Sequence, residues 1–363
     1  MPVPSLVFLV PGDLATLTGG YVYDRHIVEG LRTTGWSVEV VTLGEGYPHP
    51  SPAVRRHAAE RVAAIADGTL VVADGLAFGA LPDLAELHAR RLRWVALVHH
   101  PLALETGLDE ATQAELFASE RRALAAARLV VVTSPSTGRA LADYGVPAER
   151  IRVVEPGVRR PPTGEAGPVP SPAQGLSMLC VATVTARKGH LTLVEALAGL
   201  QDHAWTLHCV GSLTRDEATV RELRAALAAH GLAGRVHLHG ELDEAPLAAR
   251  YAEAQLFVLP SFHEGYGMVL AEALAQGLPI VSTTAGAIPD TVPRGAGVLV
   301  PPGDVAALRE ALLRLLQAPQ LRATLAQGAR AAGARLPSWP EAVGRFDAAL
   351  RSVALGEAQG LSP

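Results

Sequence analysis

The stretch LFVLPSFHEGYGMVLAEALAQGLPIV, residues 256–281, decides the fold of this 363-residue chain. It predicts a strand over Leu256–Pro260, a helix over Met268–Gln276 and a second strand over Pro279–Ser282. A continuous apolar strand followed by a helix and another apolar strand is typical of a parallel sheet that helices cover on both faces. The stretch therefore predicts an α/β fold.

The same alternation extends outward through the chain in two series. Further strands are predicted at Leu6–Val10, Ser37–Thr42, Thr69–Ala73, Trp94–Val98 and Leu129–Thr133, and then at Met178–Val184, Trp205–Gly211, Val236–Leu238 and Gly297–Val300. Between the series, residues 159–175 are rich in Pro and Gly, as linkers are. We expect two Rossmann-like domains, residues 1–158 and 176–338, that face each other across a ligand cleft, with a helical segment over residues 339–363.

Two carboxylates flank a glycine-rich entry into the helix at the centre of the quoted stretch. Gly265 and Gly267 let the backbone approach a ligand, and the start of the helix directs unpaired N–H groups toward an anion. Glu264 and Glu272 are eight residues apart, roughly 12 Å along a helix. The carboxylates of a glycosidase lie about 5 to 9.5 Å apart, so this pair is unlike a hydrolytic one. The arrangement suits a ligand with hydroxyls at both ends and phosphates between them, as in a sugar nucleotide.

The spacing from Glu264 to Glu272 resembles the E-x7-E motif of the retaining glycosyltransferases of family 4, which have the GT-B architecture. Companion matches extend over nearly the whole chain: Gly19-Gly20, His99, Arg187-Lys188-Gly189, residues 236–240, residues 286–290 and residues 297–304. The resemblance implies that Glu264 holds the donor sugar and Glu272 the ribose. Backbone N–H groups of Gly265, Tyr266, Gly267, Met268 and Val269 would take sugar and phosphate oxygens. It also implies that the last helix crosses back onto the first domain.

Lys188 is the only lysine in the sequence and precedes a predicted helix. A retained lysine in a chain that otherwise uses arginine suggests a point charge at a diphosphate, although chance retention of a surface residue stays open. The resemblance assigns Lys188, and less clearly Arg187, to the leaving diphosphate. Many family members carry an arginine five residues before the lysine, where this chain has Thr183.

His99 and His100 follow the strand Trp94–Val98, where a parallel strand delivers side chains to the cleft. The resemblance implies that His99 lies beside the donor sugar, and the sequence leaves open which histidine faces inward. Zinc is not expected, because no third ligand occurs at metal spacing from this pair. Gly19 and Gly20 are interpreted as a flexible loop that contacts the donor, before a helix that begins near Tyr21.

The start of that helix carries a polar and aromatic cluster that includes Tyr21, Tyr23 and His26. Together with His100 it is a candidate acceptor site, and a solvated helix face is the alternative. Two basic clusters, Arg55-Arg56 and residues 90–93, leave contact with anionic lipid open, but neighbouring acids favour an ordinary surface.

Composition restricts the classes of partner and compartment. The formal net charge of -5 gives no electrostatic footprint for nucleic acid. Cys180 and Cys209 fall in apolar runs, as buried thiols of a reducing compartment do. Met1–Val10 lacks the basic start of a signal peptide, and a cytoplasmic protein is expected. No Asp-x-Asp motif occurs, so we expect neither a metal nor a cofactor beyond the donor.

These observations favour a glycosyltransferase that moves a hexosyl group from a nucleoside diphosphate sugar, a UDP-hexose, to an unidentified hydroxyl acceptor. The configuration at the anomeric carbon would be retained. A nucleotide-sugar epimerase of the same architecture and a non-catalytic nucleotide-binding subunit stay as alternatives. A phosphorylase would need pyridoxal phosphate on a lysine, and Lys188 stands in the wrong context for that role.

Overall fold

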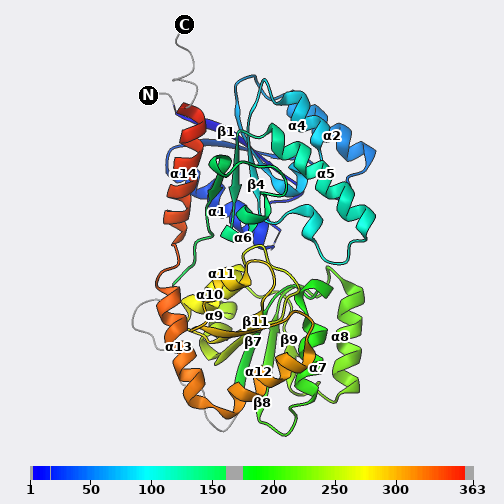
Figure 1. Ribbon diagram of the computed structural model, residues 1–363, viewed down its shortest axis with the longest axis vertical. Helices are drawn as coiled ribbons and strands as arrows, with labels where there is room; N and C mark the ends of the chain where they lie inside the picture. Colours follow the sequence, from blue (N-terminus) through cyan, green and yellow to red (C-terminus); the bar gives the residue numbers. More distant parts are fainter. Residues whose placement is uncertain (1–2, 17, 161–174, 356–363) are drawn as a thin grey trace. The chain divides into compact units, whose positions relative to one another are not determined.

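The computed structural model describes residues 3–16, 18–160 and 175–355. The chain divides into two compact units, Met1–Gly157 with Pro337–Pro363, and Val158–Leu336. Each unit is built on its own six-stranded sheet (Figure 1). Residues 161–174 of the expected linker lie outside the described residues.

The sheet of the first unit is parallel throughout, in the order β2-β1-β3-β4-β5-β6. Its strands are β1 (Ser5–Val10), β2 (Ser37–Thr42), β3 (Leu70–Asp74), β4 (Arg93–Val98), β5 (Leu129–Val132) and β6 (Ile151–Val153). The sequence did not predict β6, which is three residues long and lies at the edge of the sheet. A short edge strand with polar Arg152 at its centre has no continuous apolar run to reveal it.

Helices connect these strands in the first unit. They are α1 (Gly19–Thr33), α2 (Pro52–Ala63), α3 (Gly75–Phe78), α4 (Pro82–His88), α5 (Glu110–Ala126) and α6 (Pro135–Ala140), with 3₁₀ turns at Leu102–Leu104 and Ala148–Arg150. Several begin at a side-chain cap. Asp109, for example, accepts a hydrogen bond from the Thr112 N–H at 2.7 Å at the start of α5.

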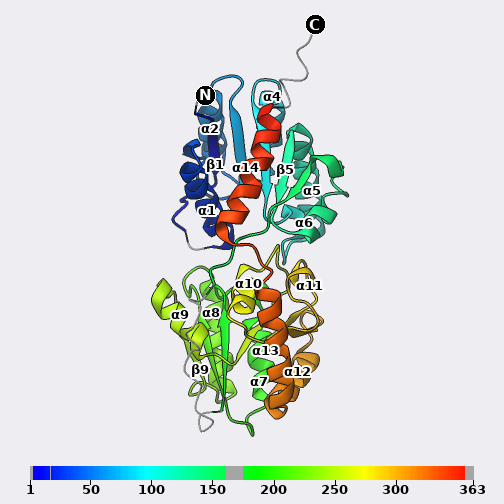
Figure 2. The ribbon, with the colours of Figure 1, turned by 90° about the vertical axis from the view of Figure 1, so that its left-hand side faces the viewer.

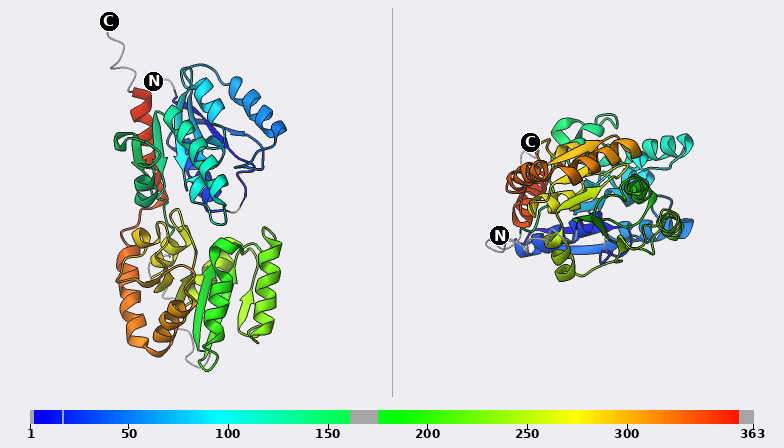
Figure 3. Two further views of the ribbon diagram at one scale, coloured as in Figure 1. Left: turned by 45° about the vertical axis from the view of Figure 1, so that its right-hand side comes forward. Right: turned by 90° about the horizontal axis from the view of Figure 1, so that it is seen from below.

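The last helix, α14 (Trp339–Leu355), belongs to the first unit. It packs along α1, and it appears beside that unit in Figure 2 and again, in red, in Figure 3. The Trp36 indole N–H donates to Asp347 at 2.6 Å, and Gly30 of α1 leaves room for the Val343 side chain. These contacts fix the helix against α1.

The second sheet is also parallel, in the order β12-β11-β10-β7-β8-β9. Its strands are β7 (Leu176–Val181), β8 (Trp205–Val210), β9 (Val236–Leu238), β10 (Leu256–Leu259), β11 (Ile280–Thr283) and β12 (Gly297–Val300). Its helices are α7 (His190–Ala198), α8 (Glu217–Ala229), α9 (Glu244–Glu253), α10 (Met268–Ala275), α11 (Ile288–Thr291), α12 (Val305–Gln317) and α13 (Pro319–Gly333).

Each unit has a separate hydrophobic core formed by its sheet and covering helices. All residues of β3, β10 and β11 are buried, including the polar Asp74, Ser282 and Thr283 at the ends of β3 and β11. In the second unit α7 packs against α8 and α12, whereas α10 packs against α11 and α13. The strand order reverses between β7 and β10, and ligands bind at such a reversal in open α/β sheets.

Candidate functional site

The turn from β10 into α10 places Glu264 in front of a helix N-terminus. Gly267 occupies the position before the helix with φ of 84°, a conformation that glycine adopts without strain. The predicted helix start near Gly267 is confirmed, since α10 runs from Met268 to Ala275. The first N–H groups of such a helix have no partner within it and face outward.

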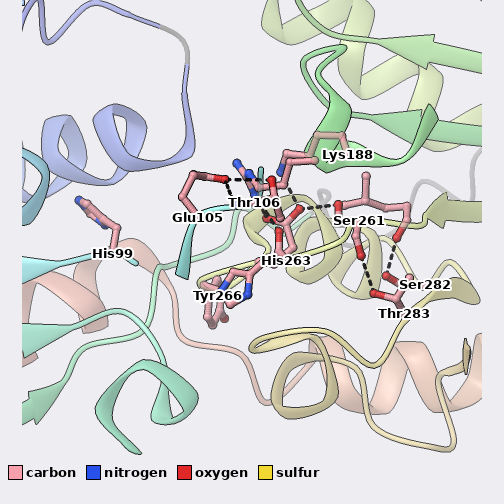
Figure 4. Close-up of polar contacts among 12 residues, drawn as sticks. His99, Glu105, Thr106, Lys188, Ser261, His263, Tyr266, Ser282 and Thr283 are labelled. Atoms are coloured by element: carbon pink, nitrogen blue, oxygen red, sulfur yellow. Dashed lines mark hydrogen bonds and ion pairs between the residues drawn. The ribbon is translucent and has the colours of Figure 1, made fainter. Parts of the chain in front are cut away.

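Glu264 is buried and is held by three polar neighbours. Its Oε1 accepts hydrogen bonds from Lys188 Nζ at 2.6 Å and from Ser261 Oγ at 2.7 Å, and Arg187 Nη1 lies 3.8 Å from Oε2. Figure 4 shows the contacts around Lys188 and Ser261. Burial by itself raises the pKa of Glu264, but the two cations and these hydrogen bonds outweigh it and keep the pKa below its ordinary value. The carboxyl is therefore ionised at neutral pH.

Lys188 and Arg187 occupy a 3₁₀ turn, Ala186–Lys188, which follows β7. Gly189 ends the turn with φ of 71°, and a Cβ there would collide with the Pro260 carbonyl oxygen. The Phe262 N–H donates to the Arg187 carbonyl at 2.8 Å, and Arg187 Nη1 donates to the His263 carbonyl at 2.7 Å. The loops after β7 and β10 are thus joined at the reversal of strand order.

Further groups fix the backbone on both sides of Glu264. Thr283 Oγ1 donates to the Ser261 carbonyl at 2.6 Å, and Thr291 Oγ1 donates to the Tyr266 carbonyl at 2.7 Å. The Ala287 N–H donates to the Glu264 carbonyl at 2.9 Å. Sequence analysis missed the roles of Ser261, Thr283 and Thr291, because isolated hydroxyls near strand and helix ends carry no distinguishing pattern.

Glu272 lies on α10 and has a different environment from Glu264. Its Oε2 accepts a hydrogen bond from the Tyr251 hydroxyl at 2.9 Å. Burial raises its pKa, and the Tyr251 hydrogen bond and the charge of Arg159 act in the opposite direction. Tyr251 comes from α9 and was not predicted as a site residue. The signal that could have found it is a single tyrosine in a helix otherwise dominated by Ala and charged residues.

The remaining predicted donor residues lie along the same turn. Tyr266 is buried and packs with Val158 and Ala271, while Met268 and Val269 are half-buried in the first turn of α10. Gly265 is also half-buried. Contact of their backbone N–H groups with a donor stays a prediction.

In the first unit, His99 is placed by two acidic residues that the sequence did not connect with it. His99 Nε2 lies 2.9 Å from Asp24 Oδ1 and 3.5 Å from Asp74 Oδ2. Burial by itself lowers the pKa of His99, but Asp24, through its charge and its hydrogen bond, and then Asp74 raise it to about 10. His99 is therefore protonated at neutral pH. His100, its neighbour, is half-buried.

The prediction that no third ligand lies near His99 has to be corrected. Asp24, Asp74 and His99 offer ligand atoms that all lie within 4.8 Å of one another, close enough for a metal ion. The sequence could not show this, because the three residues are far apart in the chain and meet only through the order of β1, β3 and β4 in the sheet. The 2.9 Å distance between His99 Nε2 and Asp24 Oδ1 is that of a hydrogen bond, which is an ion pair when His99 is protonated.

Gly19 and Gly20 form the first turn of α1 and not a flexible loop before it. Thr18 caps the helix, with its hydroxyl accepting from the Tyr21 N–H at 3.4 Å. A capping threonine starts the helix two residues earlier than glycine propensity suggests. Gly20 packs against His99, since a Cβ at Gly20 would lie 3.4 Å from His99 Cδ2.

Two of the candidate acceptor residues are engaged within the first unit. Tyr23 is buried, and its hydroxyl donates to the Val154 carbonyl at 2.9 Å. The His26 ring stacks on Trp339, with ring centroids 3.9 Å apart. Their periodicity on α1 places them toward the core and α14, so these two contribute to packing. Tyr21 is half-buried.

Two family models match the chain. Residues 175–318 match the model described as Glycosyl transferases group 1, and residues 18–160 match the model described as Glycosyltransferase Family 4. The chain belongs to the family 4 glycosyltransferases.

Relatives of this family 4 chain include curated bacterial enzymes. It is 33% identical over 274 residues to the D-inositol 3-phosphate glycosyltransferase of Xylanimonas cellulosilytica, covering 69% of this chain and 65% of that relative. It is 29% identical over 320 residues to the MMP alpha-(1->4)-mannosyltransferase of Mycolicibacterium hassiacum. The match covers 83% of this chain and 74% of that relative. The chain thus matches somewhat less than two thirds of the length of the first relative.

Solved structures share the fold of the family 4 chain. Sucrose-phosphate synthase from Thermosynechococcus elongatus aligns with a TM-score of 0.80 at 22% identity, covering 97% of this chain and all (100%) of that chain. HepE of Anabaena, solved in complex with UDP and glucose, aligns with a TM-score of 0.74 at 20% identity. The alignment covers 96% of this chain and 99% of the HepE chain. At these identities the likeness concerns the fold alone. The predicted class, two Rossmann-like domains of the GT-B type, is confirmed. Among the described residues, no helix is both long and apolar enough to cross a membrane.

Proposed function

We propose that the protein is a retaining glycosyltransferase that moves a hexosyl group from a nucleoside diphosphate sugar, a UDP-hexose, to a hydroxyl acceptor. The observation that carries this proposal is the cluster of Lys188, Arg187 and Glu264 at the reversal of strand order between β7 and β10. The cluster combines two cations, an ionised carboxylate and a helix N-terminus, which is the set of groups that a sugar diphosphate requires.

Each group has a defined task in the proposed reaction. Negative charge grows on the departing diphosphate as the glycosidic bond breaks, and Lys188 and Arg187 stabilise that charge more in the transition state than in the ground state. Glu264 accepts hydrogen bonds from the sugar hydroxyls. Glu272, with Tyr251 fixing one oxygen, accepts from the ribose hydroxyls.

Retention of the anomeric configuration and independence from metal are part of the proposal. Retention is proposed from membership of the family. Metal independence is proposed because Lys188, Arg187 and the first turn of α10 supply positive charge where the diphosphate would lie. Full activity in EDTA is expected, and its complete loss would contradict this part.

Calorimetric titration and turnover assays with UDP-, GDP- and ADP-hexoses test the proposal. Lys188→Ala is expected to weaken binding of the preferred donor, and both Lys188→Ala and Glu264→Gln should lower kcat/KM about a hundredfold or more. Arg224→Ala and Glu222→Gln remove exposed charges on α8 and are matched controls that should retain activity.

Three results would overturn the proposal. Full activity in either site variant would contradict the site assignment. Conversion of the sugar nucleotide without any acceptor would favour the epimerase alternative. Failure of the folded protein to bind any nucleotide sugar would favour a non-catalytic subunit.

A further inference from the structure

A buried acidic pair lies at the carboxyl end of the first sheet. Asp74 is the last residue of β3, His99 directly follows β4, and Asp24 lies on α1, which follows β1. The sheet order β2-β1-β3-β4-β5-β6 reverses direction between β1 and β3. The three side chains therefore meet at the reversal point of this sheet, where open α/β sheets bind ligands.

Among the described residues, hydrogen bonds hold the imidazole of His99 at its Nε2 edge, and the Tyr23 ring packs edge-on against it with ring centroids 5.3 Å apart. Nε2 faces Asp24 Oδ1 at 2.9 Å and Asp74 Oδ2 at 3.5 Å, and Gly20 packs against the neighbouring Cδ2. The Asp24 side chain is 0% exposed and that of Asp74 is 6% exposed, whereas the His99 side chain is 22% exposed. The carboxylates of Asp24 and Asp74 close the Nε2 edge of the ring, and Nδ1 is not among the buried side-chain nitrogens of the described residues that lack a partner. Within the described part of the chain, no hydrogen bond to Nδ1 is found.

The carboxyl group of Asp24 is fully buried beside His99. Burial raises the pKa of Asp24 to about 7, with Asp74 acting in the same direction and His99 against it. Asp24 Oδ2 is buried and accepts no hydrogen bond from the described residues.

We propose that Asp24 and Asp74 are positioning residues that hold His99 by Nε2 and turn its Nδ1–H toward an oxygen of the sugar substrate. This inference rests on the proposed glycosyl transfer. With Nε2–H donating to Asp24 and Nδ1–H donating to the substrate, His99 carries both protons. It is then a fixed hydrogen-bond donor and cannot accept the proton that the acceptor hydroxyl loses.

The arrangement has a simple physical advantage. A hydrogen bond from a charged donor is stronger than one from a neutral donor, and a ring locked at one edge needs no reorientation when substrate binds. A histidine without the acidic pair would be largely neutral above pH about 6.5 and free to rotate. The two aspartates would thus fix both the charge and the direction of His99.

The first test is a nitrogen-15 NMR measurement of the histidine rings in the intact protein without substrate. His99→Gln identifies the His99 signals by their loss. At pH 8 the wild type should show His99 with both ring nitrogens protonated, whereas Asp24→Asn should show a neutral ring. Asp13→Asn removes an exposed carboxylate of the loop after β1 and should leave the His99 signals unchanged. A neutral His99 in the wild type, or an unchanged ring in Asp24→Asn, would overturn the proposal.

The second test measures transfer as a function of pH. Asp24→Asn should lower kcat/KM at least tenfold at pH 8, with partial recovery toward pH 6 as His99 regains its proton. Asp74→Asn should act in the same direction with a smaller effect, because Asp74 lies farther from Nε2 and asparagine can also cap α3. A folded Asp24→Asn variant with wild-type activity and pH profile would contradict the positioning role.

These tests separate the inference from the function on which it rests. Absence of any transfer by the wild type would remove the proposed function, while the NMR measurement would still decide whether the acidic pair holds His99. If Asp24→Asn does not fold, the protonation state of His99 in the wild-type spectrum and the pH dependence of transfer by Asp74→Asn test the positioning role instead. Binding of one equivalent of Mn²⁺ or Zn²⁺ to the wild type but not to Asp74→Asn would identify a metal site and overturn the proposal.

Discussion

At the residue scale, charged side chains act in opposed pairs in both units. Glu264 is buried against Lys188, and His99 is held by Asp24. The charge of Lys188 outweighs the cost of burying Glu264 and keeps Glu264 ionised. The charge of Asp24 does the same for His99. An ionised buried group is kept in one orientation by its partner, which is what recognition of a polar ligand requires.

The His99 pair should make stability depend on pH in a defined direction. The pKa of His99 is about 10 in the folded protein and about 6.5 when unfolded. Its stabilising contribution is therefore fully present below pH about 6.5, declines as the pH rises, and is lost above about 10. The melting-temperature difference between wild type and His99→Gln should be large at pH 6 and small at pH 10.

His57→Gln is the control for this measurement. His57 is exposed on α2, and its replacement should give a small difference that does not vary with pH in this way. A difference for His99→Gln that grows from pH 6 to pH 10 would contradict the ion pair.

At the element scale, the glycine turns set how closely the loops of the second unit approach one another. Gly286, in the loop between β11 and α11, has φ of 55°, and a Cβ there would collide with the Glu264 carbonyl oxygen. Gly189 approaches the Pro260 carbonyl oxygen in the same manner. The position of Glu264 therefore depends on backbone contacts between three loops as well as on its own side-chain partners.

Gly286→Ala should destabilise the protein by about 2 to 4 kcal/mol, combining left-handed backbone strain with the collision. Gly231→Ala is the matched control, since Gly231 has φ of 66° but nothing within 4 Å of the added Cβ. The free energy of unfolding of Gly231→Ala should fall by about 1 to 2 kcal/mol, because only the backbone strain applies there. Urea unfolding curves followed by circular dichroism give both values. Equal losses would contradict a collision between the added Cβ and the Glu264 carbonyl oxygen.

At the scale of the whole molecule, two separate cores carry two separate polar clusters. The cluster of Lys188 and Glu264 belongs to Val158–Leu336, and the cluster of His99 belongs to the other unit. A ligand that binds the folded state lowers the population of locally opened states by a factor of about 1 + [L]/Kd. The location of that protection identifies which unit binds the donor.

Hydrogen exchange of the intact protein with saturating donor should therefore slow most at residues 186–190 and 261–276. At a donor concentration of about 100 times Kd, exchange through local opening should slow there about a hundredfold. Amides of α2, in the first unit, should be unaffected. Protection confined to the first unit would contradict donor binding at Lys188 and Glu264.

Much of the second unit could be predicted from local sequence patterns. The strand Leu256–Pro260, the glycine-rich turn and the start of α10 were found because apolar runs and left-handed glycines act within a few residues. Lys188 was singled out as the only lysine in the chain, and its Nζ lies 2.6 Å from Glu264 Oε1.

Other parts of both sites could not be predicted. Gly19 and Gly20 were assigned to a loop, although the Thr18 cap places them inside α1. Tyr23 was assigned to the acceptor, although its hydroxyl is bonded to the Val154 carbonyl 131 positions away in the chain. Long-range contacts of this kind leave no trace in the spacing of the residues that make them.

The sequence by itself determined the two α/β halves and the start of α10, and it singled out Lys188 and Glu264 as candidates, because each depends on periodicity, glycine conformation or composition. Only the tertiary structure decided that Asp24 and Asp74 meet His99, and that Tyr251 meets Glu272. The reason is physical: side chains at the ends of parallel strands become neighbours through the order of strands in the sheet, and that order differs from their order in the chain.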